Sequence, residues 1–447
     1  MGLKLKLEVK NAFLERHRAL RVAKNARDVD ARHVAVDVSA CCRSVVAALE
    51  HRGSGHTVTA SDISRRFFDK YTRNHPEATH FYFAFDSYAD MHGIRHKMYS
   101  ESRYAEASEE RLQNLKPGEV VVRNRIYRYE CRPYTQDEAD AWKLHTEIDA
   151  RRVFNGSAGK QKLYQLMFDE MVRHSAQQLG LAGPRTIVLD GIGAHGDPRG
   201  VVTVRLDGDR RVEVEAGPRA AKHGEADQKL AHYFASMPDK GDGCAWYTID
   251  GDAIGQCACL GLQCQIVYPN NQVVDTKLLP RGTSVAMALL ADGGDYNDSF
   301  MYAGIHSETL LGADPSEVVS LEPGGGVSVN TPRLFQFLGT EAETPRRKRA
   351  VFSVDGEPPA KFYRTQAKAR EAAEERGGAQ VHKHGPTGHM VARSIGDLVR
   401  SVVYWLHAGT DNSSDFGMLD GVYAGLAGSL GDLERETTAE RLRELSS

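Results

Sequence analysis

Two short apolar runs, each of which reaches an aspartate, constrain the fold of this chain most strongly. The first, HVAVDVS, covers residues 33–39, and the second, THFYFAFD, covers residues 79–86. Runs dominated by apolar and aromatic residues are typical of strands buried on both faces of a sheet. Because the stretch 57–75 between them has helical spacing, the whole reads as a β-α-β unit, which favours a parallel sheet with a right-handed crossover. The sequence therefore predicts an α/β fold.

The same pattern resumes after a less readable middle part and continues toward the C-terminus. Alternating apolar residues with turn signals predict strands, and apolar spacing of three and four residues predicts helices. We expect strands at 186–191, 244–252 and 351–356, a hairpin at 201–216, and helices at 87–115, 160–179, 223–235, 285–298, 367–376 and 398–409.

The division into regions follows from breaks in this pattern. A glycine-rich segment at 322–328 and a basic run, PRRKR, at 345–349 suggest a boundary near residues 340–350. We expect the N-terminal half of a core at 1–115, an insertion at 116–205, the C-terminal half of the core with a helix-turn-helix-like segment at 206–340, and a C-terminal accessory region at 345–447.

Composition limits the class of protein and its surroundings. With 447 residues, 41% of them hydrophobic, the chain can build two or three domains with a substantial core. It lacks an apolar run of about 18 residues, so no membrane span is expected, and its start does not read as a signal peptide. An odd number of cysteines, seven, favours a reducing, intracellular compartment. PRRKR is either a nuclear localisation signal or an exposed basic linker in a cytoplasmic protein.

Acidic residues fall where the predicted strands end and the predicted helices begin. In open α/β sheets that edge is where sites are built, so we expect these acids to converge. Convergent carboxylates raise one another's pKa unless cations are present, and oxygen-only ligands select Mg²⁺ or Mn²⁺ rather than zinc. The alternative for any single acid is a turn residue or a helix cap. The seven acids are Asp37, Asp86, Glu225, Asp227, Asp250, Asp252 and Asp295.

The order of these segments resembles the flap endonuclease and 5′→3′ exonuclease superfamily, of which this chain would be a divergent or viral member. The matching motifs are MGL at the start, then VAVDVS, FAFD, GEADQKLA, TIDGD and GGDY, and they cover roughly residues 1–110 and 205–312. The resemblance implies a PIN-like fold. This has a central, mostly parallel twisted sheet with helices on both faces, an insertion over the active site, a degenerate helix-three-turn-helix and a C-terminal α+β extension.

The resemblance also implies the chemistry. All seven acids would be ligands of two Mg²⁺ or Mn²⁺ ions about 4 Å apart, an arrangement that suits phosphodiester hydrolysis. Three basic residues, Arg95, Lys97 and Arg103, would contact the scissile phosphate and stabilise its developing charge, unless they belong to an exposed helix face. The partner would be DNA or RNA with a free or flapped 5′ end. Three outcomes stay open: a flap endonuclease-like 5′-nuclease, an RNA-directed 5′→3′ exoribonuclease or mRNA-degrading nuclease, and a catalytically inactive nucleic-acid-binding scaffold.

Some residues depart from the family pattern. Asp86 is followed by Ser87 rather than glycine, and Asp227 stands where a second glutamate is common. In the segment YAGIHSETLL, His306 replaces the second glycine of the family's Gly-Ile-Gly hairpin, which grips duplex DNA.

Other motifs favour structural readings. The spacing of Cys257, Cys259 and Cys264 is not a standard zinc spacing, so buried core cysteines are expected. VHKHGPTGH at 381–389 predicts a solvated loop, and Asp355 a turn residue. The segment 121–134 interleaves arginine with tyrosine and predicts either a channel for single-stranded nucleic acid or an amphipathic strand pair.

Overall fold

The computed structural model divides the chain into two compact units. The sheet unit comprises Ala19–Ile249 and Gln263–Lys277, and the terminal unit comprises Met1–Arg18, Asp250–Leu262 and Leu278–Ser447. The structure describes residues 3, 5–25, 28–50, 58–86, 119–122, 125–128, 133–154, 156–177, 184–191, 200–207, 210–217, 225–294, 307–312, 318–321, 327–330, 351–356, 363, 366–384, 398, 401–402 and 405–406.

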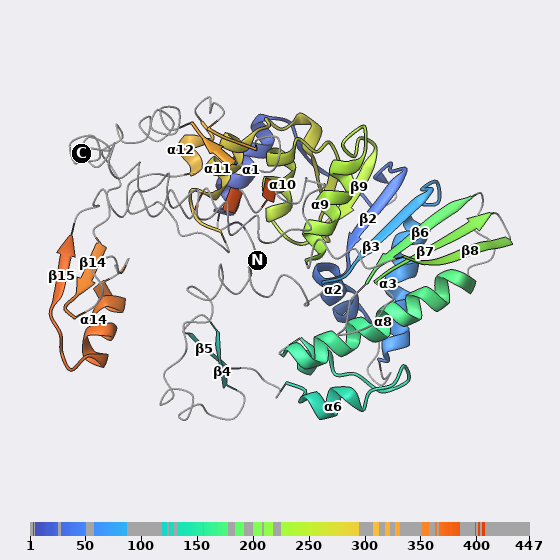
Figure 1. The fold of residues 1–447 in the computed structure, drawn as a ribbon, viewed down its shortest axis with the longest axis horizontal. Helices are drawn as coiled ribbons and strands as arrows, with labels where there is room; N and C mark the ends of the chain where they lie inside the picture. The colour runs from blue at the N-terminus through green and yellow to red at the C-terminus, as the bar shows by residue number, and fades with distance from the viewer. Residues whose placement is uncertain are drawn as a thin grey trace. The chain divides into compact units, whose positions relative to one another are not determined.

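The sheet unit is built on one sheet of nine strands in the order β1-β11-β10-β9-β2-β3-β6-β7-β8 (Figure 1). Its central strands, from β10 to β6, run parallel, and two antiparallel strands extend it on each side. The predicted α/β class with a parallel centre is confirmed. The bounds are β1 Leu20–Val22, β2 His33–Asp37, β3 His80–Ala84, β6 Arg185–Asp190, β7 Val201–Asp207, β8 Arg210–Gly217, β9 Cys244–Tyr247, β10 Gln265–Val267 and β11 Gln272–Asp275.

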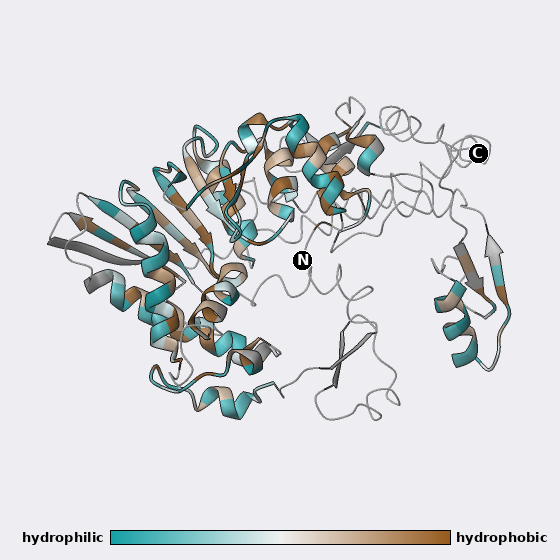
Figure 2. Ribbon diagram, turned by 180° about the vertical axis from the view of Figure 1, so that it is seen from behind, coloured by the Kyte–Doolittle hydropathy of each residue, from teal (hydrophilic) through white to brown (hydrophobic). Residues whose placement is uncertain are grey.

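Helices cover both faces of this sheet. Phe83 of β3 faces α3, where its ring contacts Phe67 and Phe68, whereas the neighbouring Tyr82 faces α9 and contacts Tyr233. Strand alternation thus sends successive side chains into two separate layers. Figure 2 shows hydrophilic and hydrophobic residues interleaved along the helices, as expected of helices with one buried face. The covering helices are α2 Val38–Glu50, α3 Ala60–Asn74 and α8 Ser157–Gln177 on one face and α9 Ala226–Ser236 on the other.

The region 116–205 contributes directly to the central sheet. β6 lies between β3 and β7, and α8 packs against β6 and β7, so this part of the expected insertion belongs to the same sheet as the residues on either side. The earlier part of the region 116–205 contains a strand pair, which agrees with one of the two alternatives predicted for residues 121–134. Its elements are β4 Glu119–Val122, paired antiparallel with β5 Arg125–Arg128, then α6 Gln136–Asp140 and α7 Ala150–Val153.

The terminal unit contains helices and small strand pairs. Residues 381–384 form a strand paired with 351–354, so the predicted loop is wrong there. A distant partner strand, which local pattern does not reveal, satisfies their backbone groups. Asp355 lies in a turn, as predicted. Other bounds are α1 Leu7–Arg16, α10 Asp252–Leu260, α11 Thr283–Leu290, α12 Ser307–Leu310, α14 Gln366–Glu375, β12 Val319–Leu321, β13 Val327–Val329, β14 Val351–Val354 and β15 Val381–His384, with a 3₁₀ turn η2 at Thr276–Leu278.

Burial agrees with the structural interpretation of the cysteine motif. Cys257, Cys259 and Cys264 are buried free cysteines, as predicted. Within the described ranges, every helix is too short or too polar to span a lipid bilayer.

Gly255 of α10 provides a test of packing in the terminal unit. A Cβ at this position would lie 2.2 Å from a ring carbon of the buried Trp405. Gly255→Ala should therefore destabilise the protein by about 1–3 kcal/mol, the usual cost of overpacking, as measured by urea unfolding. Combining it with Trp405→Leu should cost less than the sum of the two single changes. An unchanged midpoint for Gly255→Ala would contradict this packing.

His75 provides a test in the sheet unit. Its Nε2 lies 2.6 Å from the hydroxyl of Tyr247, and burial lowers the pKa of His75 from 6.5 to about 4. Between these values the unfolded chain takes up a proton that the folded protein does not. Stability should therefore fall as the pH drops from 6.5 to about 4, by up to about 1.4 kcal/mol per pH unit for this group.

His75→Gln should flatten that part of the stability profile, measured by urea unfolding at several pH values. The same change at the exposed His145 is the control for losing an imidazole. If the stability of wild type and of His75→Gln falls equally steeply with pH, His75 is not the source of this pH dependence.

Candidate functional site

Asp37 and Asp86 lie at the C-terminal ends of neighbouring parallel strands. Asp37 is the last residue of β2 and is in register with Ala84, the last residue of β3. Asp86 follows two residues later, and its backbone N–H donates to Oγ of Ser39 over 3.0 Å. Because Ser39 lies in the first turn of α2, two residues after the end of β2, this bond ties the two strand ends together. The first two acids of the predicted set therefore meet at one sheet edge.

Both carboxylates also cap helices. Oδ1 of Asp37 accepts the N–H of Ala40 at the start of α2 over 2.8 Å, and Oδ2 accepts the hydroxyl of Thr248 over 3.3 Å. Oδ1 of Asp86 accepts the N–H of Ala226, the first residue of α9, over 3.0 Å. Negative charge is favoured at helix N-termini. Both acids therefore accept N–H groups at helix starts, as the helix-cap alternative predicts, and their role as metal ligands stays a prediction.

Glu225 and Asp227 belong to the same helix end that Asp86 caps. Glu225 is the N-cap residue of α9, and Asp227 lies in its first turn. Four acids of the predicted set, Asp37 among them, therefore come from two strand ends and one helix start of the sheet unit. Their oxygen-only chemistry fits Mg²⁺ or Mn²⁺. Among the residues that the structure describes, however, no three His, Cys, Asp or Glu side chains are grouped closely enough to hold an ion.

The other predicted site residues belong to the terminal unit or lie outside the described ranges. Asp250 and Asp252 belong to the terminal unit, where the N–H of Asp252 donates to Oδ1 of Asp250 over 3.1 Å. β9 ends at Tyr247, so these two acids follow the strand rather than end it, and Asp252 begins α10. The convergence of all seven acids stays a prediction. Outside the described ranges lie Asp295, the three basic residues Arg95, Lys97 and Arg103, the hairpin glycine position at His306, and the PRRKR run.

The structure adds a buried ion pair that the sequence analysis missed. Nζ of Lys229, on α9, lies 2.9 Å from Oδ1 of Asp190, and the two side chains are 2% and 3% exposed. The same ammonium donates to the backbone carbonyls of Phe85, over 2.9 Å, and Gly191, over 3.1 Å. Oδ2 of Asp190 accepts the hydroxyl of Tyr82. All three ammonium protons therefore have acceptors, as a buried lysine requires.

Sequence signals for this pair existed. Asp190 ends the apolar strand TIVLD, just as Asp37 ends β2. Lys229 precedes Leu230 and lies four residues before Tyr233, on the apolar side of a helix that was predicted correctly. A lysine on a buried helix face implies an acidic partner nearby, because an unpaired buried charge is very costly.

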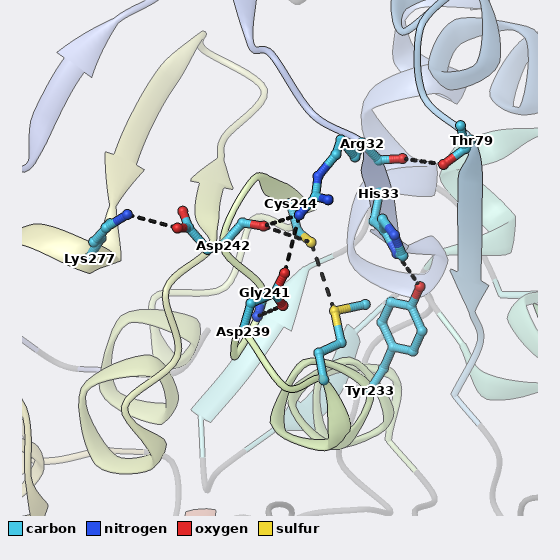
Figure 3. A network of polar contacts seen from close by, with 10 residues as sticks. Arg32, His33, Thr79, Tyr233, Asp239, Gly241, Asp242, Cys244 and Lys277 are labelled. Atoms are coloured by element: carbon cyan, nitrogen blue, oxygen red, sulfur yellow. Dashed lines mark hydrogen bonds and ion pairs between the residues drawn. The ribbon is translucent and has the colours of Figure 1, made fainter.

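A second polar network lies at the opposite, N-terminal edge of the sheet (Figure 3). The hydroxyl of Tyr233 bonds to Nδ1 of His33 over 2.8 Å, and the ring of His33 stacks on His80 with 4.3 Å between centroids. Burial, aided by repulsion from His80 and Arg32, lowers the pKa of His33 to about 4. Arg32 pairs with Asp239 over 3.1 Å. This edge is rich in hydrogen bonds and lies at the end of the strands opposite to Asp37 and Asp86.

No model of a known protein family matches this chain, and no curated protein sequence matches it. Function is therefore inferred from the order of its motifs and from the chemistry of the acidic sheet edge.

The Lys229–Asp190 pair provides a stability test. Lys229→Met should cost about 3–5 kcal/mol, because it leaves Asp190 buried without its partner. Adding Asp190→Asn removes the second charge, so the double variant should be more stable than the sum of the two single changes predicts. Urea unfolding of all four proteins measures this coupling.

The exposed pair Arg32–Asp239 is the matched control, because its side chains are 67% and 44% exposed. The same substitutions there, Arg32→Met and Asp239→Asn, should show coupling of only about 0.2–1 kcal/mol. If the coupling energy between Lys229 and Asp190 equals that between Arg32 and Asp239, the buried pair contributes no more to stability than the exposed one, and this prediction is wrong.

Proposed function

We propose that this chain is a metal-dependent nuclease that hydrolyses phosphodiester bonds of DNA or RNA, in the manner of a flap endonuclease-like 5′-nuclease. One observation carries the proposal. Asp86, at the end of a central parallel strand, accepts the first N–H of α9, the helix that starts with Glu225 and Asp227. The strand-end motif and the helix-start motif, which are about 140 residues apart in the sequence, are thus joined at the edge that also contains Asp37.

In this proposal the chain's own residues position ligands rather than attack the substrate. Asp37, Asp86, Glu225 and Asp227 would hold Mg²⁺ or Mn²⁺, and Asp250, Asp252 and Asp295 would complete the set. When bound, two such ions activate water and stabilise the leaving oxygen. Helix ends and strand ends are rigid supports. A metal site needs such supports, because it tolerates only small errors in the positions of its ligands.

The proposed substrate is a nucleic acid with a free or flapped 5′ end. Arg95, Lys97 and Arg103 would contact the scissile phosphate and stabilise the charge that develops there. The net charge of −3 gives no general attraction to nucleic acid. Binding of nucleic acid would therefore depend on local basic segments such as the one with Arg95, Lys97 and Arg103. The affinity should weaken as the salt concentration rises.

The test is a panel of 5′-labelled substrates: flap DNA, duplex DNA, single-stranded DNA and single-stranded RNA, each with Mg²⁺, Mn²⁺ or EDTA. We expect cleavage with either ion and none in EDTA. Asp86→Asn should lower the rate by orders of magnitude, because it removes a ligand charge with little change in shape. Asp239→Asn, at the opposite edge of the same sheet, is the matched control and should cut like wild type.

The outcomes separate the alternatives. Cleavage of RNA alone, from the 5′ end, would replace the flap endonuclease reading with a 5′→3′ exoribonuclease. Binding of substrates without cleavage in any metal would point to an inactive scaffold and refute the nuclease proposal.

A further inference from the structure

We propose that Lys229, paired with Asp190, is a positioning residue of the candidate site: it fixes α9 against the ends of β3 and β6 so that Glu225 and Asp227 stay beside Asp86. This inference rests on the proposed function, because it gives the buried pair a role toward the same carboxylates.

The peptide unit between Phe85 and Asp86 is fixed on both sides. Its carbonyl accepts the ammonium of Lys229 over 2.9 Å, and its N–H donates to Oγ of Ser39 over 3.0 Å. Because a peptide unit is planar and rigid, these two bonds set its orientation. The position from which the Asp86 side chain leaves the backbone is set with it.

The contacts between the start of α9 and the end of β3 form a closed ring. Asp86 accepts the N–H of Ala226 at the first residue of α9, and Lys229 lies one helical turn further along the same helix. The Lys229 ammonium returns to the carbonyl of Phe85, which is bonded to Asp86. A ring of this kind resists sliding or tilting of the helix start relative to the strand end, because either motion breaks at least one of its bonds.

The Lys229–Asp190 pair extends this ring to a second strand, β6, without adding net charge. Asp190 ends β6, and the register places it beside Ala84, with Asp37 on the other side of Ala84. The negative charge of Asp190 balances Lys229, so the two together leave the local charge to the acids of the site. Their nearly complete burial strengthens the contact, because water does not compete for it.

Lys229 thus acts through the backbone of Phe85 and through α9. Its three ammonium protons are directed to Asp190, Phe85 and Gly191, which leaves it a positioning role rather than a catalytic one.

The experiment uses the full chain with Lys229→Met and Asp190→Asn together, so that neither charge is left unpaired. Hydrogen exchange of the α9 start, read at the amides of residues 226–229, reports whether the helix end stays in place. Electron paramagnetic resonance of added Mn²⁺, well below the melting temperature, reports the ion affinity of the folded protein. We expect exchange at the α9 start to rise relative to the amides of β2, and the Mn²⁺ affinity to fall about 10- to 100-fold, as for other residues that orient ligands.

Two further proteins complete the design. Arg32→Met with Asp239→Asn makes the same chemical change at the opposite edge and should alter neither readout. Tyr82→Phe removes one partner of Asp190 but keeps the ion pair, and should change both readouts in the same direction to a smaller degree. If the double variant does not fold, Tyr82→Phe decides, and unchanged readouts in it would overturn the inference.

The failure of this inference can be told apart from that of the proposed function. If wild type binds Mn²⁺ and cleaves but the double variant keeps its affinity, the positioning role is overturned and the nuclease proposal stands. Faster exchange with unchanged affinity also overturns it, since the pair then serves only the fold. If wild type neither binds Mn²⁺ nor cleaves, the proposed function fails, and the role toward a metal fails with it.

Discussion

The buried ammonium of Lys229 is the interaction on which the arrangement of the acidic edge depends. A lysine in the protein interior must find an anion and acceptors for all its protons, because water is absent there. Here the end of β6 provides the anion, and backbone carbonyls following β3 and β6 provide the other acceptors. One side chain therefore joins a helix to two strands. The start of that helix is in turn held by Asp86, so the positions of the strand ends and of the helix are mutually dependent.

Helix N-termini explain how several carboxylates can share this edge. Convergent acids were expected to repel one another without cations. In the sheet unit Asp37 and Asp86 instead accept backbone N–H groups from α2 and α9, whose dipoles favour negative charge. Asp190 is balanced by Lys229. The protein thus offsets part of the repulsion with its own partial and full charges, which would leave a bound cation to offset the remainder.

The two edges of the sheet differ in chemistry although the same helix spans both. Along α9, Lys229 meets an acid at the C-terminal ends of the strands, whereas Tyr233 meets His33 at the N-terminal ends. The histidine edge is stabilised by neutral hydrogen bonds and ring stacking, and by exposed ion pairs such as Arg32–Asp239. Burial lowers the pKa of both His33 and His80, so this edge favours the folded state near neutral pH. The acidic edge combines carboxylate oxygens with rigid supports, as the proposed metal site would require.

The sequence by itself determined the α/β class, most strand and helix positions in the sheet unit, and the placement of Asp37 and Asp86 at strand ends, because burial on both faces leaves continuous apolar runs. It also indicated the buried cysteines through their spacing and neighbours. Tertiary structure alone decided that β6 belongs to the central sheet, that residues 381–384 pair as a strand, and that Lys229 meets Asp190. Each of these depends on a partner distant in the chain, and local periodicity shows that a face is buried but not what it is buried against.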